Sequence, residues 1–405
     1  MSKKSIAVWG TGKRARKFIC MYRSKFDIVC CYDNSANDGK RFCEGVPVRK
    51  YDSNETMSIM IASSFWNEIV SQLMEDGKIV GKDIFIDVFI KNIVKYEDWV
   101  MLSRLIGNQK FDAKGLAMGR KVSMVYGNCQ TRVVENVLTY SDEFNQEYWI
   151  ISIPRIYEWD KGYDLQCFLG DSKLWDMIEL FVYQHVADTN TYSLELSTSR
   201  IMNRLSGSCR KVSILNLYFL GYFMQYEPNN NNYLKDIEGM GLLHWRDKYV
   251  DELIEQGYPK EKILSLINCD SFIEGSEIEK KSQESLNELM ARERGVDVKI
   301  VEYIEANFRG KQLFHSVNHP CKSLMIEYAN RILEYIGYDR VNISEEDVWI
   351  RSLKATDIPI YPAVIKYLNM EKWETKYYPN RWMANDLVLS FDDYIEMYIA
   401  LNTME

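Results

Sequence analysis

The stretch VSMVYGNCQTRVVENVL, residues 122–138, joins a short apolar run to a helical pattern through Gly127, Asn128 and Cys129. The apolar run predicts a buried strand, and the valines and leucine that follow recur at the spacing of one helix face. Asn128 suits the position just before a helix, where its side chain accepts a backbone N–H. The stretch therefore predicts a strand, a tight turn and a helix, which together are the unit of an α/β fold.

Cys129 lies in the turn of this unit, between Asn128 and Gln130. A cysteine at the first turn of a helix lies at the carboxyl edge of the sheet, where the helix dipole favours the thiolate form. In an intracellular protein a cysteine is more often a small buried hydrophobic residue. Because the neighbours here are a glycine and amides, and not apolar residues, we interpret Cys129 as a candidate nucleophile.

The rest of the chain extends the α/β pattern. Residues 5–88 alternate apolar runs with helical ones, which predicts a parallel sheet covered by helices in a small Rossmann-like domain over residues 1–90. Residues 91–118 are charged and predict a helical linker. Residues 119–405 predict a larger, helix-rich α/β domain, with strands near 121–126, 148–154, 178–186 and 210–219. Four asparagines at 229–232 predict a surface loop.

Composition and charge exclude several classes of function. A chain of 405 residues is too long for one hydrophobic core, so two domains are expected. The formal net charge of -8 argues against nucleic-acid binding through phosphate neutralisation. No apolar run is long enough for a membrane span and a strand-like pattern begins at residue 5, so we expect a cytoplasmic location. Nine cysteines without a CxxC pair, and only four histidines, indicate reduced thiols and no metal site.

The run GTGKRA, residues 10–15, lies between a predicted strand and helix and matches the GxGxxG/A dinucleotide pattern. Its glycines allow a tight turn close to a pyrophosphate, which the helix N-terminus attracts. Asp33 ends the next strand, at about the 20-residue separation typical of an acid that binds ribose hydroxyls. The candidate nucleotide-binding residues are Gly10, Thr11, Gly12, Lys13, Arg14, Asp33 and Asn34. A plain strand-to-helix turn is the alternative.

A cysteine nucleophile needs a base, and the chain offers His185, His244, His315 and His319. The last two lie in LFHSVNHPCKSLM, where Asn318 and a proline restrict the backbone ahead of a helical pattern. His185 follows Gln184 at the end of a predicted strand, where α/β sheets place ligands, although it could equally be a core histidine. His244 is expected to be structural.

The motifs VYGNCQ, FVYQHVADTNTYSLELSTSRI, KVSILNLYFLGYF and FHSVNHP occur in this order between Val122 and about Ile336. In order and spacing they resemble the WcbI family of capsular polysaccharide biosynthesis enzymes. The resemblance implies a coenzyme A-binding acetyltransferase whose fold is distantly similar to that of SGNH hydrolases. It implies catalytic roles for Cys129 and His319, because GNCQ and NHP match the nucleophile and base motifs. The chain departs from the SGNH pattern at Ser316, where an acid usually precedes the histidine by three residues.

The same resemblance, with the residues around the motifs, predicts an oxyanion and substrate-binding set: Gly127, Asn128, Gln130, Arg132, Gln184, His185, Tyr218, Tyr222, His315 and Asn318. The amide of Asn128 or Gln130 is expected to hold an oxyanion together with backbone N–H groups. The candidates for the phosphates of coenzyme A are Arg132, Arg200, Arg204 and Lys322. For the arginines a solvated side chain is the alternative, and for the two tyrosines it is a place in the core.

The first ninety residues contain GTGKRA, CYDNSANDGKRFC and GVPV. In this layout they resemble the N-terminal domain of PglD- and NeuD-type sugar acyltransferases. That resemblance implies a nucleotide-sugar in the Rossmann crevice, and NAD(P) is the alternative ligand.

Together these features predict transfer of an acyl group from acetyl-CoA to a sugar or nucleotide-sugar. Cys129 either carries the acyl group covalently or only shapes the site while His319 deprotonates the acceptor. The alternatives are an SGNH-like esterase or deacetylase acting on polysaccharide, a non-catalytic nucleotide-sugar-binding module, and an NAD-dependent oxidoreductase. We expect a homo-oligomer or an association with other glycan-biosynthesis enzymes, and no nucleic-acid partner.

Overall fold

The computed structural model describes residues 3–36, 41–228, 245–350, 352–354, 357–377 and 388–403. The chain forms two units. Unit 1 comprises Met1–Tyr126, Ser141–Val182 and Val186–Lys211, and unit 2 comprises Gly127–Tyr140, Tyr183–His185 and Val212–Glu405. The asparagine run at 229–232 and His244 lie outside the described residues.

The N-terminal part of unit 1 is built on a six-stranded sheet with the order β3-β4-β2-β1-β5-β6. Its strands are β1 (Lys4–Trp9), β2 (Phe26–Tyr32), β3 (Arg41–Cys43), β4 (Val46–Arg49), β5 (Ser58–Ile61) and β6 (Ile84–Ile86). All pairs are parallel except β3 with β4. The crossover helices are α1 (Lys13–Tyr22) and α2 (Trp66–Glu75). The predicted alternation of strands and helices is confirmed in this region.

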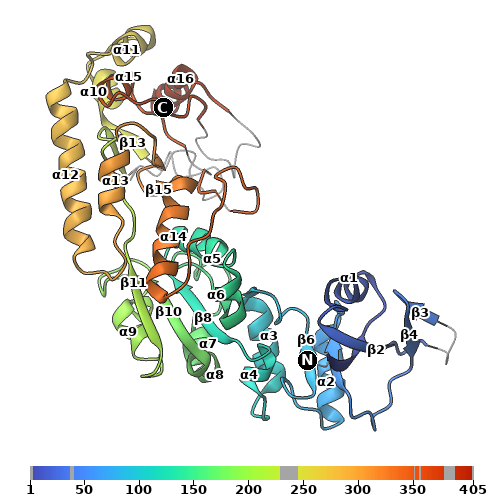
Figure 1. Ribbon diagram of the computed structural model, residues 1–405. Helices are drawn as coiled ribbons and strands as arrows, with labels where there is room; N and C mark the ends of the chain where they lie inside the picture. Colours follow the sequence, from blue (N-terminus) through green and yellow to red (C-terminus); the bar gives the residue numbers. More distant parts are fainter. Residues whose placement is uncertain are drawn as a thin grey trace. The chain divides into compact units, whose positions relative to one another are not determined.

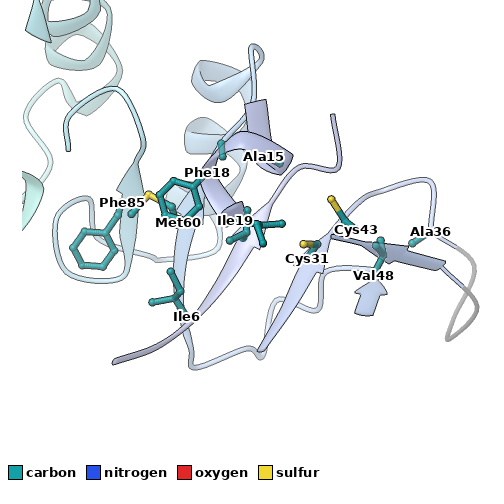
Figure 2. Packing of buried hydrophobic residues seen from close by; sticks show 12 residues of the cluster. Ile6, Ala15, Phe18, Ile19, Cys31, Ala36, Cys43, Val48, Met60 and Phe85 are labelled. Carbon is teal, nitrogen blue, oxygen red and sulfur yellow. The ribbon is translucent and has the colours of Figure 1, made fainter. Parts of the chain in front are cut away.

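Helix α1 covers this sheet with one apolar face. Ala15, Phe18 and Ile19, at i, i+3 and i+4, are the buried residues of the helix. Figure 2 shows them packed with Ile6 and Met60 of the strands. Two of the chain's cysteines belong to the same cluster, and burial raises the pKa of the Cys31 thiol to about 12. None of the nine cysteines, all of which lie among the described residues, forms a disulfide bond.

A second sheet has the order β11-β10-β8-β9-β7. Its strands are β7 (Ile93–Lys95), β8 (Lys121–Tyr126), β9 (Tyr148–Ser152), β10 (Ile178–Gln184) and β11 (Arg210–Ile214). The helices of unit 1 that follow or connect them are α3 (Tyr96–Ile106), α4 (Ala113–Leu116), α6 (Asp142–Glu147), α7 (Leu165–Gly170), α8 (Ser172–Met177), the 3-10 turn η1 (Leu194–Leu196) and α9 (Thr198–Met202). Strands β7 and β8 each pair in parallel with β9.

The segment 91–118 contains more than the predicted helical linker. Strand β7 pairs with β9 at the edge of the second sheet, and α3 and α4 follow it. A strand of three residues is too short to show an alternating pattern. Because the residues around β7 are charged, the sequence did not predict a strand there. The two units also divide the chain differently from the boundaries near residues 90 and 119, which remain a prediction.

Unit 2 is rich in helices, as expected. Its helices are α5 (Gln130–Leu138), α10 (Lys248–Glu255), α11 (Lys260–Ile267), α12 (Gly275–Glu293), α13 (Val301–Asn307), α14 (Lys322–Ile336), α15 (Pro362–Tyr367) and α16 (Phe391–Thr403). Two short antiparallel pairs join β12 (Tyr226–Pro228) to β13 (Trp245–Asp247), and β14 (Phe314–Ser316) to β15 (His319–Pro320). Helices α5 and α14 lie side by side (Figure 1). Among the described residues, no helix has the length and apolar character needed to cross a membrane.

Candidate functional site

The turn between β8 and α5 is closely packed against the end of β10. Gly127 has a φ of +151°, and a Cβ at this position would lie 2.3 Å from Gln184 Oε1. The same Gln184 oxygen accepts the backbone N–H of Asn128 at 2.9 Å. This position therefore requires glycine. Gln184 is buried and its side chain hydrogen-bonds the backbone of the turn. The structure thus gives it a supporting role in place of the predicted contact with substrate.

Asn128 lies one residue before the N-cap of α5, which is Cys129 itself. Its Oδ1 accepts the backbone N–H of Gln130 at 2.9 Å, and its Nδ2 donates to Asn216 Oδ1 at 2.8 Å. The N-cap was predicted at Asn128 and lies at Cys129, one residue later. An amide nitrogen carries two hydrogens, and within the described structure one of those on Asn128 is used.

Gln130 is enclosed in the interior and hydrogen-bonds through both ends of its side-chain amide. Its Nε2 donates to Leu217 O at 2.7 Å and to Asn318 O at 3.0 Å. Its Oε1 accepts from Leu217 N and from Gln184 Nε2, each at 3.0 Å. Both amide hydrogens are therefore committed to backbone carbonyls. The prediction that Gln130 donates to an oxyanion is corrected: this side chain joins three segments of unit 2.

The bond from Gln130 to Asn318 brings the two predicted catalytic residues into neighbouring segments. Cys129 directly precedes Gln130, and His319 directly follows Asn318. The hairpin of β14 and β15 holds the second segment, and Cys321 N donates to Leu313 O at 2.8 Å where the hairpin closes. Cys129 and His319 are partly exposed, whereas Gln130 is buried. The segments that contain the thiol and the imidazole are thus joined by a buried side chain.

Ser316 occupies the position of the acid found in the SGNH pattern, and the structure shows what it contacts. Ser316 is buried, and its Oγ donates to Asn318 Oδ1 at 3.4 Å. It therefore braces the turn of the hairpin. A hydroxyl here cannot supply the negative charge that an acid would place behind the imidazole of His319.

Tyr222 was expected either to line an acceptor site or to belong to the core, and it lies in the core. Its hydroxyl oxygen lies 2.7 Å from Phe308 O and 2.8 Å from Lys311 O, which share its single hydrogen, and it accepts from Leu313 N at 3.3 Å. Burial raises its pKa well above the usual value. Tyr222 therefore anchors the backbone that leads into β14. Tyr218 is only half-buried, and burial raises its pKa as well.

His315 is a further residue of the predicted substrate-binding set that the structure places in the interior. It is buried on β14, with Nδ1 3.6 Å from Asp357 Oδ1. Burial lowers the pKa of its imidazole, but the neighbouring Cys321 and Asp357 outweigh this effect and raise the pKa above its usual range. His315 is enclosed because β14 is covered on both faces, which the local sequence did not reveal.

The comparison with protein families matches residues 122–340 to the polysaccharide biosynthesis enzyme WcbI. This range contains the turn at Cys129 and the hairpin at His319, and it spans more than half of the 405 residues. The chain belongs to the WcbI family. The resemblance drawn from the motifs GNCQ and NHP is therefore confirmed, and with it the broad function in polysaccharide biosynthesis.

A solved structure of WcbI, a polysaccharide biosynthesis enzyme, has a similar fold. It is 19% identical, with a TM-score of 0.57, and the match covers 71% of this chain and 91% of that chain. It is described as the native protein without a disulfide bond between coenzyme A and one of its cysteines. A comparison with curated proteins found no match.

The remaining predicted side chains near the WcbI motifs differ in their exposure and in the hydrogen bonds or ion pairs that they already form. Arg132 is partly exposed and lies 3.4 Å from the buried Glu135. His185 is exposed directly after β10, so it is not the core histidine of the alternative interpretation. Lys322 Nζ donates to Asp347 O at 2.8 Å, and Arg204 contacts Leu169 O and Glu195. Of the four candidates for phosphate contacts, Arg200 is therefore the exposed one, whereas Arg132, Arg204 and Lys322 are partly exposed.

The glycine motif of unit 1 lies outside the range matched to WcbI and forms the turn from β1 to α1. Gly10 has a φ of +127°, and a Cβ there would lie 2.8 Å from Ala62 O. Thr11 Oγ1 donates to Asp33 Oδ2 at 2.6 Å, which lowers the pKa of that carboxyl, with further bonds from Ser35. Arg14 is paired with Asp87. Arg14 is thus used internally, whereas Lys13 and Asn34 are exposed.

Two residues of the WcbI region contribute to the site without having been predicted. Asn216 fixes the side chain of Asn128, and Leu217 offers both its backbone groups to Gln130. They follow β11, which ends at Ile214 and not near residue 219 as expected. Asn216, a polar residue inside the apolar run ILNLYFLGYF, was the signal in the sequence that the strand ends before it.

Proposed function

We propose that this chain is a coenzyme A-dependent acyltransferase that acetylates a sugar during synthesis of a capsular or other surface polysaccharide. The observation that carries this proposal is the Gln130 side chain. It bonds the segment that contains His319 to the helix start that contains Cys129. One buried amide thereby joins the segments of a candidate nucleophile and a candidate base. A cysteine-dependent transfer needs such a nucleophile and base close together.

In the covalent version of the reaction, Cys129 Sγ attacks the thioester carbonyl of acetyl-CoA. A bond forms between this sulfur and the acetyl carbon, and the bond to the coenzyme A sulfur breaks, so coenzyme A leaves as a thiol after taking a proton. The sugar oxygen then attacks the acetyl carbon and the bond between this carbon and Cys129 Sγ breaks. The proton of the sugar hydroxyl passes through His319 to the Cys129 sulfur. In the direct version, His319 deprotonates the sugar hydroxyl, which attacks acetyl-CoA itself.

The oxyanion of either version needs donors aimed at the carbonyl oxygen. With Gln130 engaged in the interior, the backbone N–H groups at the start of α5 and the second Nδ2 hydrogen of Asn128 are the remaining candidates. The helix N-terminus adds a favourable field for negative charge. Arg132, in the first turn of α5, is our candidate for a phosphate of coenzyme A.

Coenzyme A is proposed as the acyl donor partly from the WcbI relative, whose description refers to a disulfide between coenzyme A and a cysteine. We infer that Cys129 is the cysteine of this chain that lies beside the coenzyme A thiol. Isothermal calorimetry with coenzyme A separates this function from the main alternative. An esterase or deacetylase of the polysaccharide has no use for coenzyme A, so absence of binding would favour hydrolysis.

The decisive experiment incubates the full chain with acetyl-CoA, first alone and then with a panel of UDP- and GDP-sugars. We expect transfer by the wild type, and losses of at least about 100-fold in Cys129→Ala and His319→Ala. An acetyl adduct on the Cys129 peptide in mass spectrometry supports the covalent version. Cys269→Ala, which removes an exposed cysteine elsewhere, is the matched control. Full activity in both site variants, with unchanged Tm, would exclude the mechanism.

For unit 1 we propose that the turn at Gly10–Gly12 binds the nucleotide of a sugar substrate. In the six-stranded sheet β1 lies between β2 and β5, and ligands of open α/β sheets bind where the chain switches sides in this way. Gly12→Asp adds a negative charge where a Cβ meets no atom within 4 Å. We expect it to weaken nucleotide-sugar binding with little effect on Tm. Unchanged affinity, or tighter binding of NAD than of UDP-sugars, would argue against this assignment.

A further inference from the structure

Three side chains of unit 2 that are suited to metal ions converge from separate segments. They are His315 of β14, Asp357, and Glu374 after α15. One ligand atom from each lies within 4.8 Å of the others. His315 lies inside residues 122–340, the range matched to the WcbI family, whereas Asp357 and Glu374 lie beyond it.

The buried members of this cluster lack the hydrogen bonds that burial demands. Among the described residues, neither His315 Nδ1 nor either carboxylate oxygen of Asp357 has a hydrogen-bond partner. Their side chains are 8% and 0% exposed, and the 3.6 Å between Nδ1 and Oδ1 is longer than a hydrogen bond. A carboxylate enclosed without donors is costly unless a cation lies against it.

Lys354 provides part of that charge. Its Nζ lies 2.7 Å from Glu374 but 3.7 Å from Asp357 Oδ2, outside hydrogen-bonding distance. The ammonium therefore pairs with the carboxylate of Glu374. The carboxylate of Asp357 and the imidazole nitrogen of His315 stay close to each other without a hydrogen bond. Lys354 is itself partly exposed, so its side chain can turn toward solvent when another cation enters.

We propose that His315, Asp357 and Glu374 bind one divalent transition-metal ion, with Zn²⁺ as the best match. One imidazole nitrogen and two carboxylates, with a fourth position for water, form a donor set that zinc accepts. Two ligands at 2.1 Å from a tetrahedral ion are about 3.4 Å apart, close to the 3.6 Å between His315 and Asp357. Glu374 is the least buried of the three.

The ion would fasten the segment at 357–374 to β14, the first strand of the His319 hairpin. Ile358 N already donates to His315 O at 3.0 Å, so the two segments run together here. The site is assigned a positioning function and does not depend on the acyl transfer proposed above. Its ligands are distributed over sixty residues in sequence, unlike the closely spaced pairs by which zinc sites are recognised in a sequence.

The test titrates the full chain, freed of metal with a chelator, with ZnCl₂ alone. We expect one ion per chain by calorimetry and elemental analysis, and a higher Tm with zinc. Glu374→Gln and Asp357→Asn should each weaken binding by more than about tenfold, whereas the nearby exposed Glu371→Gln should not. Lys354→Gln should tighten binding, because it removes the competing ammonium.

Co²⁺ gives a second readout, since its visible absorption reports a tetrahedral site with nitrogen and oxygen ligands. If Asp357→Asn fails to fold, the less buried Glu374→Gln still decides the question. Wild-type protein that binds no stoichiometric zinc would overturn the proposal, as would binding that survives Glu374→Gln. A Lys354→Gln variant that loses stability without gaining zinc affinity would show that the cluster is only an ion-pair network.

Discussion

Replacing Gln130 with alanine tests whether this residue supports the site or acts on the substrate. The change removes its bonds to Leu217, Asn318 and Gln184, and leaves two carbonyls and two N–H groups buried without partners. A hydrogen bond contributes about 1 kcal/mol net, and a buried group left unpaired costs about 1–3 kcal/mol. Allowing for water in the vacated space, we expect the free energy of unfolding to fall by about 4 kcal/mol, or roughly 5 °C in Tm for a chain of this length.

Thermal and urea denaturation of the full chain measure this loss. Gln283→Ala is the control, because Gln283 is exposed on α12 and its side chain bonds only Asn287 among the described residues. We expect it to change stability by less than about 0.5 kcal/mol. A Gln130→Ala protein with an unchanged Tm that no longer transfers acetyl groups would refute the structural role. It would instead restore Gln130 as the oxyanion donor.

Three further substitutions test the packing and titration described above. Gly127→Ala, with a Cβ directed at Gln184, should cost more than about 2 kcal/mol and lower activity, as measured by urea denaturation and acetyl transfer. Tyr222→Phe should cost about 2–3 kcal/mol by the same denaturation with the KM for the acceptor unchanged, because three backbone groups lose their partner. Burial raises the pKa of Asp247 to about 7, above its unfolded value, so its contribution to stability is present at low pH and lost between about pH 4 and 7. Asp247→Asn should flatten that part of the stability profile in urea denaturation.

Each of these predictions has a result that contradicts it. A Gly127→Ala protein as stable as the wild type would mean that the turn moves away from β10 at no cost. A raised KM in Tyr222→Phe at full stability would return Tyr222 to the acceptor site. Parallel stability profiles for wild type and Asp247→Asn between pH 4 and 8 would show that the Asp247 carboxyl does not titrate in this range.

Local features of the sequence were sufficient for the elements that carry the site. The apolar run before Gly127 and the apolar stripe after Cys129 correspond to β8 and the buried face of α5. Both depend on periodicity within about fifteen residues, because a strand and a helix repeat their apolar positions every 2 and 3.6 residues. Shorter elements were missed, since the three residues of β7 form no periodic pattern.

The motifs alone also predicted that Cys129 acts together with His319, but not which residue joins the two segments that contain them. Gln130 was assigned to chemistry because its neighbours are polar, and the structure instead buries it. Its partners, Leu217 and Asn318, lie 87 and 188 residues away. No local pattern records such a bond, because a buried amide is satisfied by whatever backbone the fold brings to it.

The sequence by itself therefore determined the α/β class, the strand-turn-helix at residues 122–138, the WcbI family and the two residues expected to react. Only the tertiary structure decided which amides support the turn, that Tyr222 and His315 are interior, and that His315 meets Asp357 and Glu374. The physical reason is that periodicity and turn chemistry act over neighbouring residues. Burial and hydrogen-bond partners are properties of chains that meet only after folding.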